Sequence, residues 1–158
     1  MKRGELMVNV ETMLSYFNQI RKFYANELNE RLKGENFSPN EISILILLSN
    51  NKTINTSSAL RLVLGVSKGL ISRSVDNLLK KNMIICIQDQ DDKRIQRIKL
   101  TEQARPILEK IKKEAQTINK EVLFDIDEKE ILQMEETILK ILKRINEKEC
   151  NKNEIKNV

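Results

Sequence analysis

Apolar residues recur at helical spacing through the first third of the chain. Between Val8 and Lys33 they return every three or four positions, which predicts one long amphipathic helix, with Gly34 expected to cap its end. The segment Ser38-Pro39-Asn40-Glu41 has the signature of a capping box with proline at the first helical position. It opens the run Ile42–Leu48, which is apolar on nearly all sides and predicts a short helix at the centre of the core.

Two further short helices are predicted, with a tight turn between them. The first begins at Thr56 or Ser57 and stops near Gly65, and the second runs from Ser67 to about Lys81. The buried face of the second is expected to consist of Leu70 or Ile71, Val75, Leu78 and Leu79. Two short helices joined through a glycine turn are typical of a helix-turn-helix.

The periodicity changes after Asn82. The run Met83–Ile87 is of β type, Gln88–Lys93 is a polar loop, and Ile95–Leu100 alternates between two faces. Together these segments predict a β-hairpin, the wing of a winged helix-turn-helix.

The last third returns to helical spacing. Thr101 is expected to cap a long helix, in which Pro106 removes a backbone hydrogen bond and predicts a kink or a late start. Asp125–Asp127 interrupts the pattern, and a last helix carries Ile131, Met134, Ile138, Ile141 and Ile145. These heptad-like seams require helical partners, and a second subunit is the natural cover for what the first helix leaves exposed.

The predicted fold class is therefore mainly α with a small β-hairpin wing. We expect a single domain over 1–158, with a winged-helix DNA-binding core over about 36–100. The dimerisation helices are expected over about 8–33 and 102–148, and a flexible tail over 149–158.

The charge is concentrated in the middle of the chain. The net charge is +5, and the segment Arg61–Arg105 alone holds ten basic and five acidic residues, so the rest sums to zero. A basic centre between neutral arms is expected of a phosphate-binding module, although on charge alone a solvated basic surface fits equally well.

Several function classes are disfavoured by composition. There is no histidine, and the two cysteines, Cys86 and Cys150, have no metal-ligand spacing, so neither a metal site nor a disulfide scaffold is expected. Asp89, Asp91 and Asp92 cluster on a turn with no pocket implied, and we predict no enzyme and no cofactor. The free thiols fit a cytoplasmic setting, and no apolar run approaches the roughly 20 residues that span a bilayer.

The second short helix is the candidate recognition helix. Its small and donor-rich side chains let its start approach the major groove or bind phosphate. The predicted DNA contacts here are Ser67, Lys68, Gly69, Ser72, Arg73 and Asn77. Taken alone, this segment also fits an ordinary amphipathic surface helix.

The predicted hairpin tip carries Asp92, Lys93 and Arg94. An arginine on a thin hairpin can enter a narrow minor groove, where the negative potential is highest. Asp92 can pin the guanidinium or brace the turn by accepting backbone hydrogen bonds. We therefore predict that Lys93 and Arg94 contact DNA and that Asp92 organises the wing. The alternative is a solvated turn with a weak surface ion pair.

The sequence here resembles the MarR family of regulators. The family's wing signature is Asp-x-Arg followed by Leu-Thr, present as Asp92, Arg94 and Leu100-Thr101, and Val66–Leu78 is similar to its recognition helix. Asn82 stands where the family usually has glycine, and asparagine tolerates the left-handed conformation of that turn. The resemblance implies a homodimer that reads a pseudo-palindromic operator, usually as a repressor, with a small-molecule effector bound between the DNA-binding core and the dimer helices.

Two alternatives stay open beside this reading. One is a thiol-based redox-sensing regulator that uses Cys86, although its apolar neighbours predict a buried and inert thiol. The other is a winged-helix protein-interaction module without DNA binding, against which Lys68, Arg73 and Arg94 argue together. RNA binding is disfavoured because no aromatic stacking platform accompanies the basic segment.

Overall fold

The computed structural model describes the backbone of residues 10–155 and the side chains of residues 11–148. The predicted helix start at Val8, the side chain of Cys150 and the last three residues of the predicted tail lie outside this range. Contacts divide the chain into a unit that ends at Ile118 and a unit that begins at Asn119.

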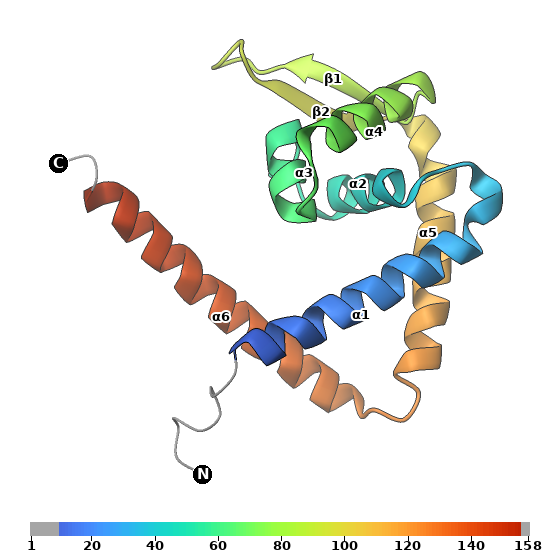
Figure 1. The fold of residues 1–158 in the computed structure, drawn as a ribbon, viewed down its shortest axis with the longest axis vertical. Helices are drawn as coiled ribbons and strands as arrows, with labels where there is room; N and C mark the ends of the chain where they lie inside the picture. The colour runs from blue at the N-terminus through green and yellow to red at the C-terminus, as the bar shows by residue number, and fades with distance from the viewer. Residues whose placement is uncertain (1–9, 156–158) are drawn as a thin grey trace. The chain divides into compact units, whose positions relative to one another are not determined.

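Unit 1 is mostly helical and carries one two-stranded antiparallel hairpin (Figure 1). Its elements are α1 (Val10–Arg31), η1 (Lys33–Glu35), α2 (Pro39–Asn50), α3 (Ser57–Leu64), α4 (Lys68–Lys80), β1 (Ile84–Gln88), β2 (Gln96–Leu100), η2 (Glu102–Ala104) and most of α5 (Arg105–Val122). This order confirms the predicted helix-turn-helix followed by a wing.

The helix starts follow the predicted capping residues. Ser38 and Glu41 form a reciprocal capping box at the start of α2, with Pro39 as the first helical residue. Thr56 caps α3 and Ser67 caps α4 through their side-chain oxygens. Gly65 ends α3 in the left-handed conformation, with φ 65°, which glycine adopts without a Cβ clash.

The core of unit 1 is centred on α2, which contacts α1, α3, α4 and β2. Its residues Ile42, Ile44 and Leu45 are buried, as the almost wholly apolar run predicted. The other buried hydrophobic residues are Leu28, Leu32, Leu60, Ile71, Val75, Leu78, Ile84, Ile98, Ala104, Ile107, Ile111 and Ile118. The core therefore fixes α3 and α4 to α2 from one side and leaves their other side to solvent.

The hairpin has one buried end and one projecting end. Its register pairs Ile84 with Leu100 next to the helices and Gln88 with Gln96 next to the turn. Ile84 and Ile98 are buried, whereas Ile85 and Ile87 are largely exposed. In Figure 1 the turn extends past α3, so the wing tip is presented beyond the helical body of unit 1.

One predicted cap is wrong, and a second, Thr101, stands at the N-cap position of η2 but does not cap through its side chain. Gly34 lies within η1, and the left-handed residue after it is Asn36, with φ 57°. The Thr101 side chain makes no capping hydrogen bond and instead donates to the carbonyl oxygen of Asn82 at 2.6 Å. Asn82 itself is left-handed, with φ 55°, as its tolerance for that conformation predicted. The late start expected from Pro106 is confirmed, because η2 precedes an α5 that begins at Arg105.

Unit 2 holds the end of α5 and the long helix α6 (Glu128–Ile155). The predicted break at Asp125–Asp127 is confirmed, and Asp127 accepts a hydrogen bond from the Lys129 N–H at 2.8 Å. The helix continues past residue 149, where a flexible tail was predicted, because a polar sequence can still be helical. None of the described helices is both long enough and apolar enough to cross a bilayer.

Candidate nucleic-acid interface

The predicted recognition helix, α4, has two distinct faces. Ile71, Val75 and Leu78 are buried against the core, which agrees with the predicted face. On the other side, the side chains of the predicted contacts lie in solvent: Ser67, Lys68, Gly69, Ser72 and Arg73 are all exposed. The Ser67 hydroxyl oxygen accepts the Leu70 N–H at 3.3 Å, which leaves its O–H free to donate to a partner and one lone pair free to accept.

Gly69 lies in the first turn of α4, and glycine has a lower helix propensity than alanine. A Cβ placed there would meet no atom within 4 Å, so nothing in the described structure requires a glycine at this position. The space it leaves is on the outside of the helix. An absent side chain in this place permits close approach of a partner to the start of α4.

Asn77 is less accessible than the other predicted contacts on α4. It is half-buried, and its side chain lies near Glu41, where it contributes to lowering the pKa of that carboxyl. Sequence spacing alone placed it one turn beyond Arg73 and could not show this partner. Asn77 stays a predicted contact, but one that is less accessible than Ser72 and Arg73.

The partner of Asn77 belongs to a cluster that sequence analysis did not find. Glu41 is 2% exposed and accepts a hydrogen bond from Lys81 Nζ at 2.7 Å. The same ammonium donates to the Asn36 carbonyl oxygen at 2.5 Å and lies 4.4 Å from the centre of the Phe37 ring. Burial tends to raise the pKa of Glu41, but the hydrogen bonds from Lys81, Ser38 and Asn77 together hold this pKa below its ordinary value. This cluster fixes the end of α4 against the start of α2.

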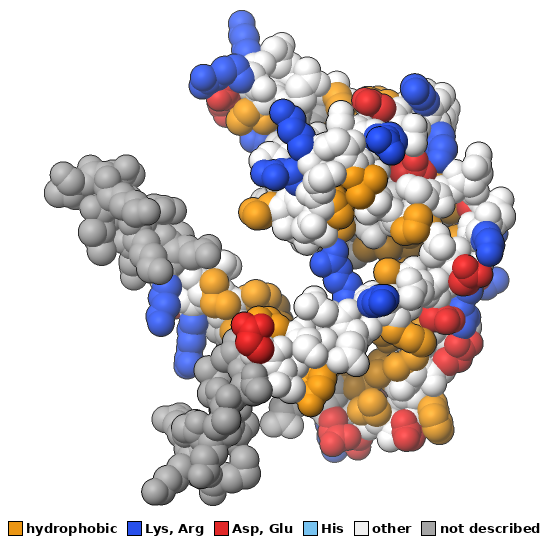
Figure 2. Space-filling model, viewed as in Figure 1, with side chains coloured by type: hydrophobic (Ala, Val, Ile, Leu, Met, Phe, Trp, Pro, Cys, Tyr) orange, Lys and Arg blue, Asp and Glu red, His pale blue; other side chains and the backbone are white. Residues whose placement is uncertain are grey.

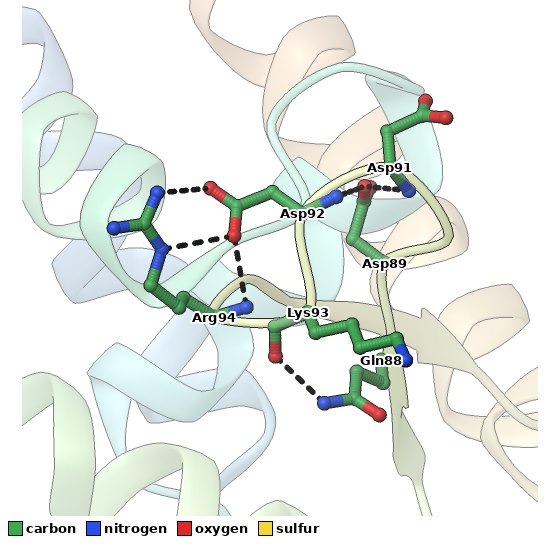
Figure 3. A network of polar contacts seen from close by, with 6 residues as sticks. All are labelled: Gln88, Asp89, Asp91, Asp92, Lys93 and Arg94. Atoms are coloured by element: carbon green, nitrogen blue, oxygen red, sulfur yellow. Dashed lines mark hydrogen bonds and ion pairs between the residues drawn. The ribbon is translucent and has the colours of Figure 1, made fainter.

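The wing tip is arranged around the carboxylate of Asp92 (Figure 3). Its Oδ1 accepts from the backbone N–H of Arg94 at 3.0 Å and from Arg94 Nε at 3.1 Å, and its Oδ2 accepts from Nη2 at 3.2 Å. The Arg94 side chain is nevertheless 90% exposed. The hydrogen bond from the Arg94 side chain is the main cause of a lowered pKa of Asp92. Asp92 therefore orients a guanidinium that still has donors facing solvent.

A second aspartate holds the base of the same turn. Asp89 Oδ1 accepts the backbone N–H groups of Asp91 and Asp92, each at 3.0 Å (Figure 3). The Gln88 side chain donates to the Lys93 carbonyl oxygen at 2.7 Å, and the Lys93 side chain is exposed. Hydrogen bonds from the backbone N–H of Asp92, the side chain of Arg97 and the backbone N–H of Asp91 lower the pKa of Asp89 to about 2. Sequence analysis had placed Asp89 only within an acidic cluster. Its position at the start of the turn between β1 and β2 was the available signal.

A groove of about 810 Å³ lies between α3, α4 and the hairpin. Its rim carries Arg61, Lys68 and hydroxyl side chains, and its floor is apolar. The lining residues are Ser57, Ser58, Arg61, Lys68, Ile71, Ser72, Val75, Asp76, Leu79, Cys86 and Gln96. Figure 2 shows Lys and Arg side chains over the hairpin tip, α3 and α4. This face of unit 1 thus combines positive charge with hydrogen-bond donors.

Cys86 contributes to the floor of this groove and is half-buried. Burial, with a smaller effect from Asp76, raises the pKa of its thiol. The thiolate is the reactive form, so this environment disfavours redox chemistry at Cys86. Within the described residues, no group of three or more His, Cys, Asp or Glu side chains is arranged so that it could hold a metal ion.

Comparison with known proteins agrees with this geometry. The model of the MarR family matches residues 37–96. YpoP of Bacillus subtilis (strain 168), an uncharacterized HTH-type transcriptional regulator, is 36% identical over 108 residues, which cover 68% of this chain and 72% of that protein.

Solved structures show the same fold. A MarR transcriptional regulator from Methanosarcina mazei Go1 is 19% identical with a TM-score of 0.69, covering 85% of this chain and 99% of that one. The transcriptional regulator BldR from Sulfolobus solfataricus is 28% identical with a TM-score of 0.65, covering 87% and 99%. The match to the family model, the relative and the shared winged helix-turn-helix together show that this chain belongs to the MarR family of transcriptional regulators.

Proposed function

We propose that the chain is a sequence-specific regulator that binds double-stranded DNA as a homodimer and represses transcription until a small-molecule effector releases it. The observation that carries the DNA-binding part is the wing tip. There, an arginine that is 90% exposed is held in one orientation by a neighbouring carboxylate. An exposed ion pair contributes little to folding, so such an arrangement is better explained by recognition.

The proposed contacts divide between two grooves. The outer face of α4 would enter the major groove, with Lys68 and Arg73 reaching bases or phosphates and Gly69 allowing close approach. Arg94, with Lys93 beside it, would reach the adjacent minor groove from the wing. The complete proposed set is Ser67, Lys68, Gly69, Ser72, Arg73, Asn77, Lys93 and Arg94, with Asp92 as the organiser of the wing.

Dimerisation is supported by exposed apolar side chains on two long helices. In α1 these are Met13, Leu14, Tyr16, Phe17, Ile20 and Phe23, and in α6 they are Leu132, Met134, Leu139, Ile141, Leu142 and Ile145. Exposed apolar surfaces of this kind are typical of protein–protein interfaces, and a second copy of the chain would bury them. A two-fold dimer would also match a pseudo-palindromic operator. We assign the dimerisation helices to about 8–33 and 102–148 and the DNA-binding core to about 36–100.

Repression, release by an effector and a cytoplasmic location are proposed from the family alone. Most regulators of this kind act beside chromosomal DNA and lose affinity when a ligand binds. The raised pKa of Cys86 argues against this thiol as the sensor of an oxidant.

Selection from a random duplex library tests the DNA-binding proposal. We expect recovery of a two-fold symmetric sequence, bound roughly a thousandfold more tightly than bulk duplex. Raising salt from 50 to 200 mM should weaken binding by at least about a hundredfold if several phosphates are contacted. Sedimentation of the free protein should show a dimer. Retention no better than bulk duplex at both salt concentrations would contradict the proposal.

A further inference from the structure

Arg97 connects the wing to the helical scaffold. It lies on β2, where it pairs with Ile87 of β1. Its Nε donates to Asp89 Oδ2 at 2.6 Å, and its Nη1 donates to Asn55 Oδ1 at 3.0 Å. Asn55 precedes α3, so one guanidinium joins the start of the wing turn to the connection between α2 and α3.

Asn55 is itself held in place at three points. Its carbonyl oxygen accepts the Ile98 N–H at 2.7 Å, and its side-chain Nδ2 donates to the Lys52 carbonyl oxygen at 3.0 Å. The side-chain oxygen is then directed to Arg97. Since both ends of the amide are engaged, Asn55 is a fixed anchor on the helical body.

The contacts continue from Arg97 to the wing tip without a break. The Asp89 side chain is 14% exposed, and its other oxygen receives the N–H groups of Asp91 and Asp92. Asp92 in turn holds the Arg94 guanidinium through both of its carboxylate oxygens (Figure 3). The path therefore runs from Asn55 through Arg97 and Asp89 to Asp92 and Arg94.

We infer that Arg97, held by Asn55 and Asp89, is a positioning residue that sets the angle and the rigidity with which the wing presents Arg94 to DNA. This inference rests on the proposed function. A tip arginine on a loose hairpin would lose more conformational freedom on binding, whereas a turn fixed in advance loses less. A cation near DNA is expected to face phosphate, but Arg97 directs two of its nitrogens to groups of its own chain.

The geometry requires an arginine at this position. The fork of the guanidinium reaches a carboxylate and an amide oxygen in one plane, whereas an ammonium is a compact point charge. Lysine at position 97 would keep the charge but could not satisfy both partners in the same arrangement. This difference separates a positioning residue from a simple phosphate contact.

The test measures the affinity of the full chain for the duplex that the wild type selects from a random library. Arg97→Gln, Arg97→Lys and Asn55→Ala should each weaken binding about tenfold, since each breaks a hydrogen bond to a charged group. Asn55→Ala changes no charge, so its loss cannot come from a missing phosphate contact. Lys99→Gln, which removes one charge from the same strand, is the matched control and should weaken binding less than about threefold.

A double-mutant cycle with Arg94→Ala completes the test. If Arg97 acts through Arg94, Arg97→Gln should weaken binding less than about twofold once Arg94 is absent. Full affinity in Arg97→Lys and Asn55→Ala, or losses that multiply in the double variant, would overturn the inference. If a melting curve shows that Arg97→Gln does not fold, the inference is tested by Asn55→Ala and its double-mutant cycle with Arg94→Ala. Absence of specific binding by the wild type would instead refute the proposed function.

Discussion

Two ion pairs in unit 1 have similar chemistry but very different burial, and we expect them to have different roles. The Glu41–Lys81 pair joins α2 to the end of α4, and its carboxylate is 2% exposed. The Asp92–Arg94 pair lies at the wing tip, and its guanidinium is 90% exposed. The first pair is closed by contacts to Asn36, Asn77 and Phe37, whereas the second leaves part of its cation in solvent.

The difference in burial predicts that the first pair stabilises the fold and that the second is available for recognition. A buried carboxylate that loses its cation remains desolvated without compensation, so the Glu41–Lys81 pair is needed for folding. An exposed pair is worth little to folding, so its carboxylate serves to orient the cation. We expect substitutions in the first pair to change stability and those in the second to change DNA affinity.

The largest expected effect is that of Lys81→Met. It leaves Glu41 buried without its ammonium and should lower the free energy of unfolding by about 3 kcal/mol. Urea unfolding at fixed protein concentration measures this, because a dimer's stability depends on concentration. Lys80→Met, which removes the exposed neighbouring charge, should stay within about 0.5 kcal/mol. Equal behaviour of the two variants would show that the buried pair does not stabilise the fold.

Arg94→Ala should weaken binding of the selected duplex about thirtyfold, since one groove contact by an arginine is lost. Its melting temperature should stay within about 2 °C of wild type, because the removed pair is exposed. The measurements are a binding titration and a thermal scan of the same preparation. A large fall in melting temperature would mean that Arg94 is structural and would reverse the comparison.

Glu41→Gln should cost about 1–2 kcal/mol near neutral pH, less than Lys81→Met, because the amide keeps an acceptor and leaves no buried charge. The folded-state pKa of Glu41 lies below its ordinary value of 4.5, so the unfolded chain binds the proton more tightly. The advantage of wild type over the variant should therefore be full above pH 4.5 and shrink as the pH falls further. Urea unfolding across pH 3 to 8 measures it, and a gap that grows toward acid would contradict the lowered pKa.

Asp92→Asn should have the smallest effect, about a fivefold loss of DNA affinity. The amide oxygen can still accept the Arg94 backbone N–H, but the charge that holds the guanidinium is gone. Affinity should remain above that of Arg94→Ala, because the arginine is still present. An affinity as low as that of Arg94→Ala would mean that the orientation of the guanidinium, rather than its presence, controls binding.

Local signals were sufficient for most of the fold. The capping box at Ser38 and Glu41, the caps Thr56 and Ser67, and the left-handed Gly65 and Asn82 all lie where their chemistry predicted. These features depend on residues within one turn, so sequence spacing describes them fully. Gly34 does not cap the first helix, and the Thr101 side chain makes no capping hydrogen bond. Both depend on the path of the chain after these residues, which local spacing does not describe.

The candidate site was predictable only where its residues are neighbours in sequence. The bond between Asp92 and Arg94 spans two residues, and the exposed face of α4 follows from helical periodicity. The proximity of Asn77 to Glu41 could not be predicted, because the two residues are far apart in the sequence. The contact of Arg97 with Asn55 likewise joins residues 42 positions apart.

The sequence by itself thus determined the order of elements, their caps, the basic centre and the wing signature, because propensity and periodicity act over a few residues. Only the tertiary structure decided which charges are buried. In the folded chain Lys81 pairs with Glu41 and Arg97 pairs with Asp89, whereas Arg94 stays exposed to solvent. Burial depends on which distant segments meet, and it separates the charges that stabilise the fold from those that stay accessible to a partner.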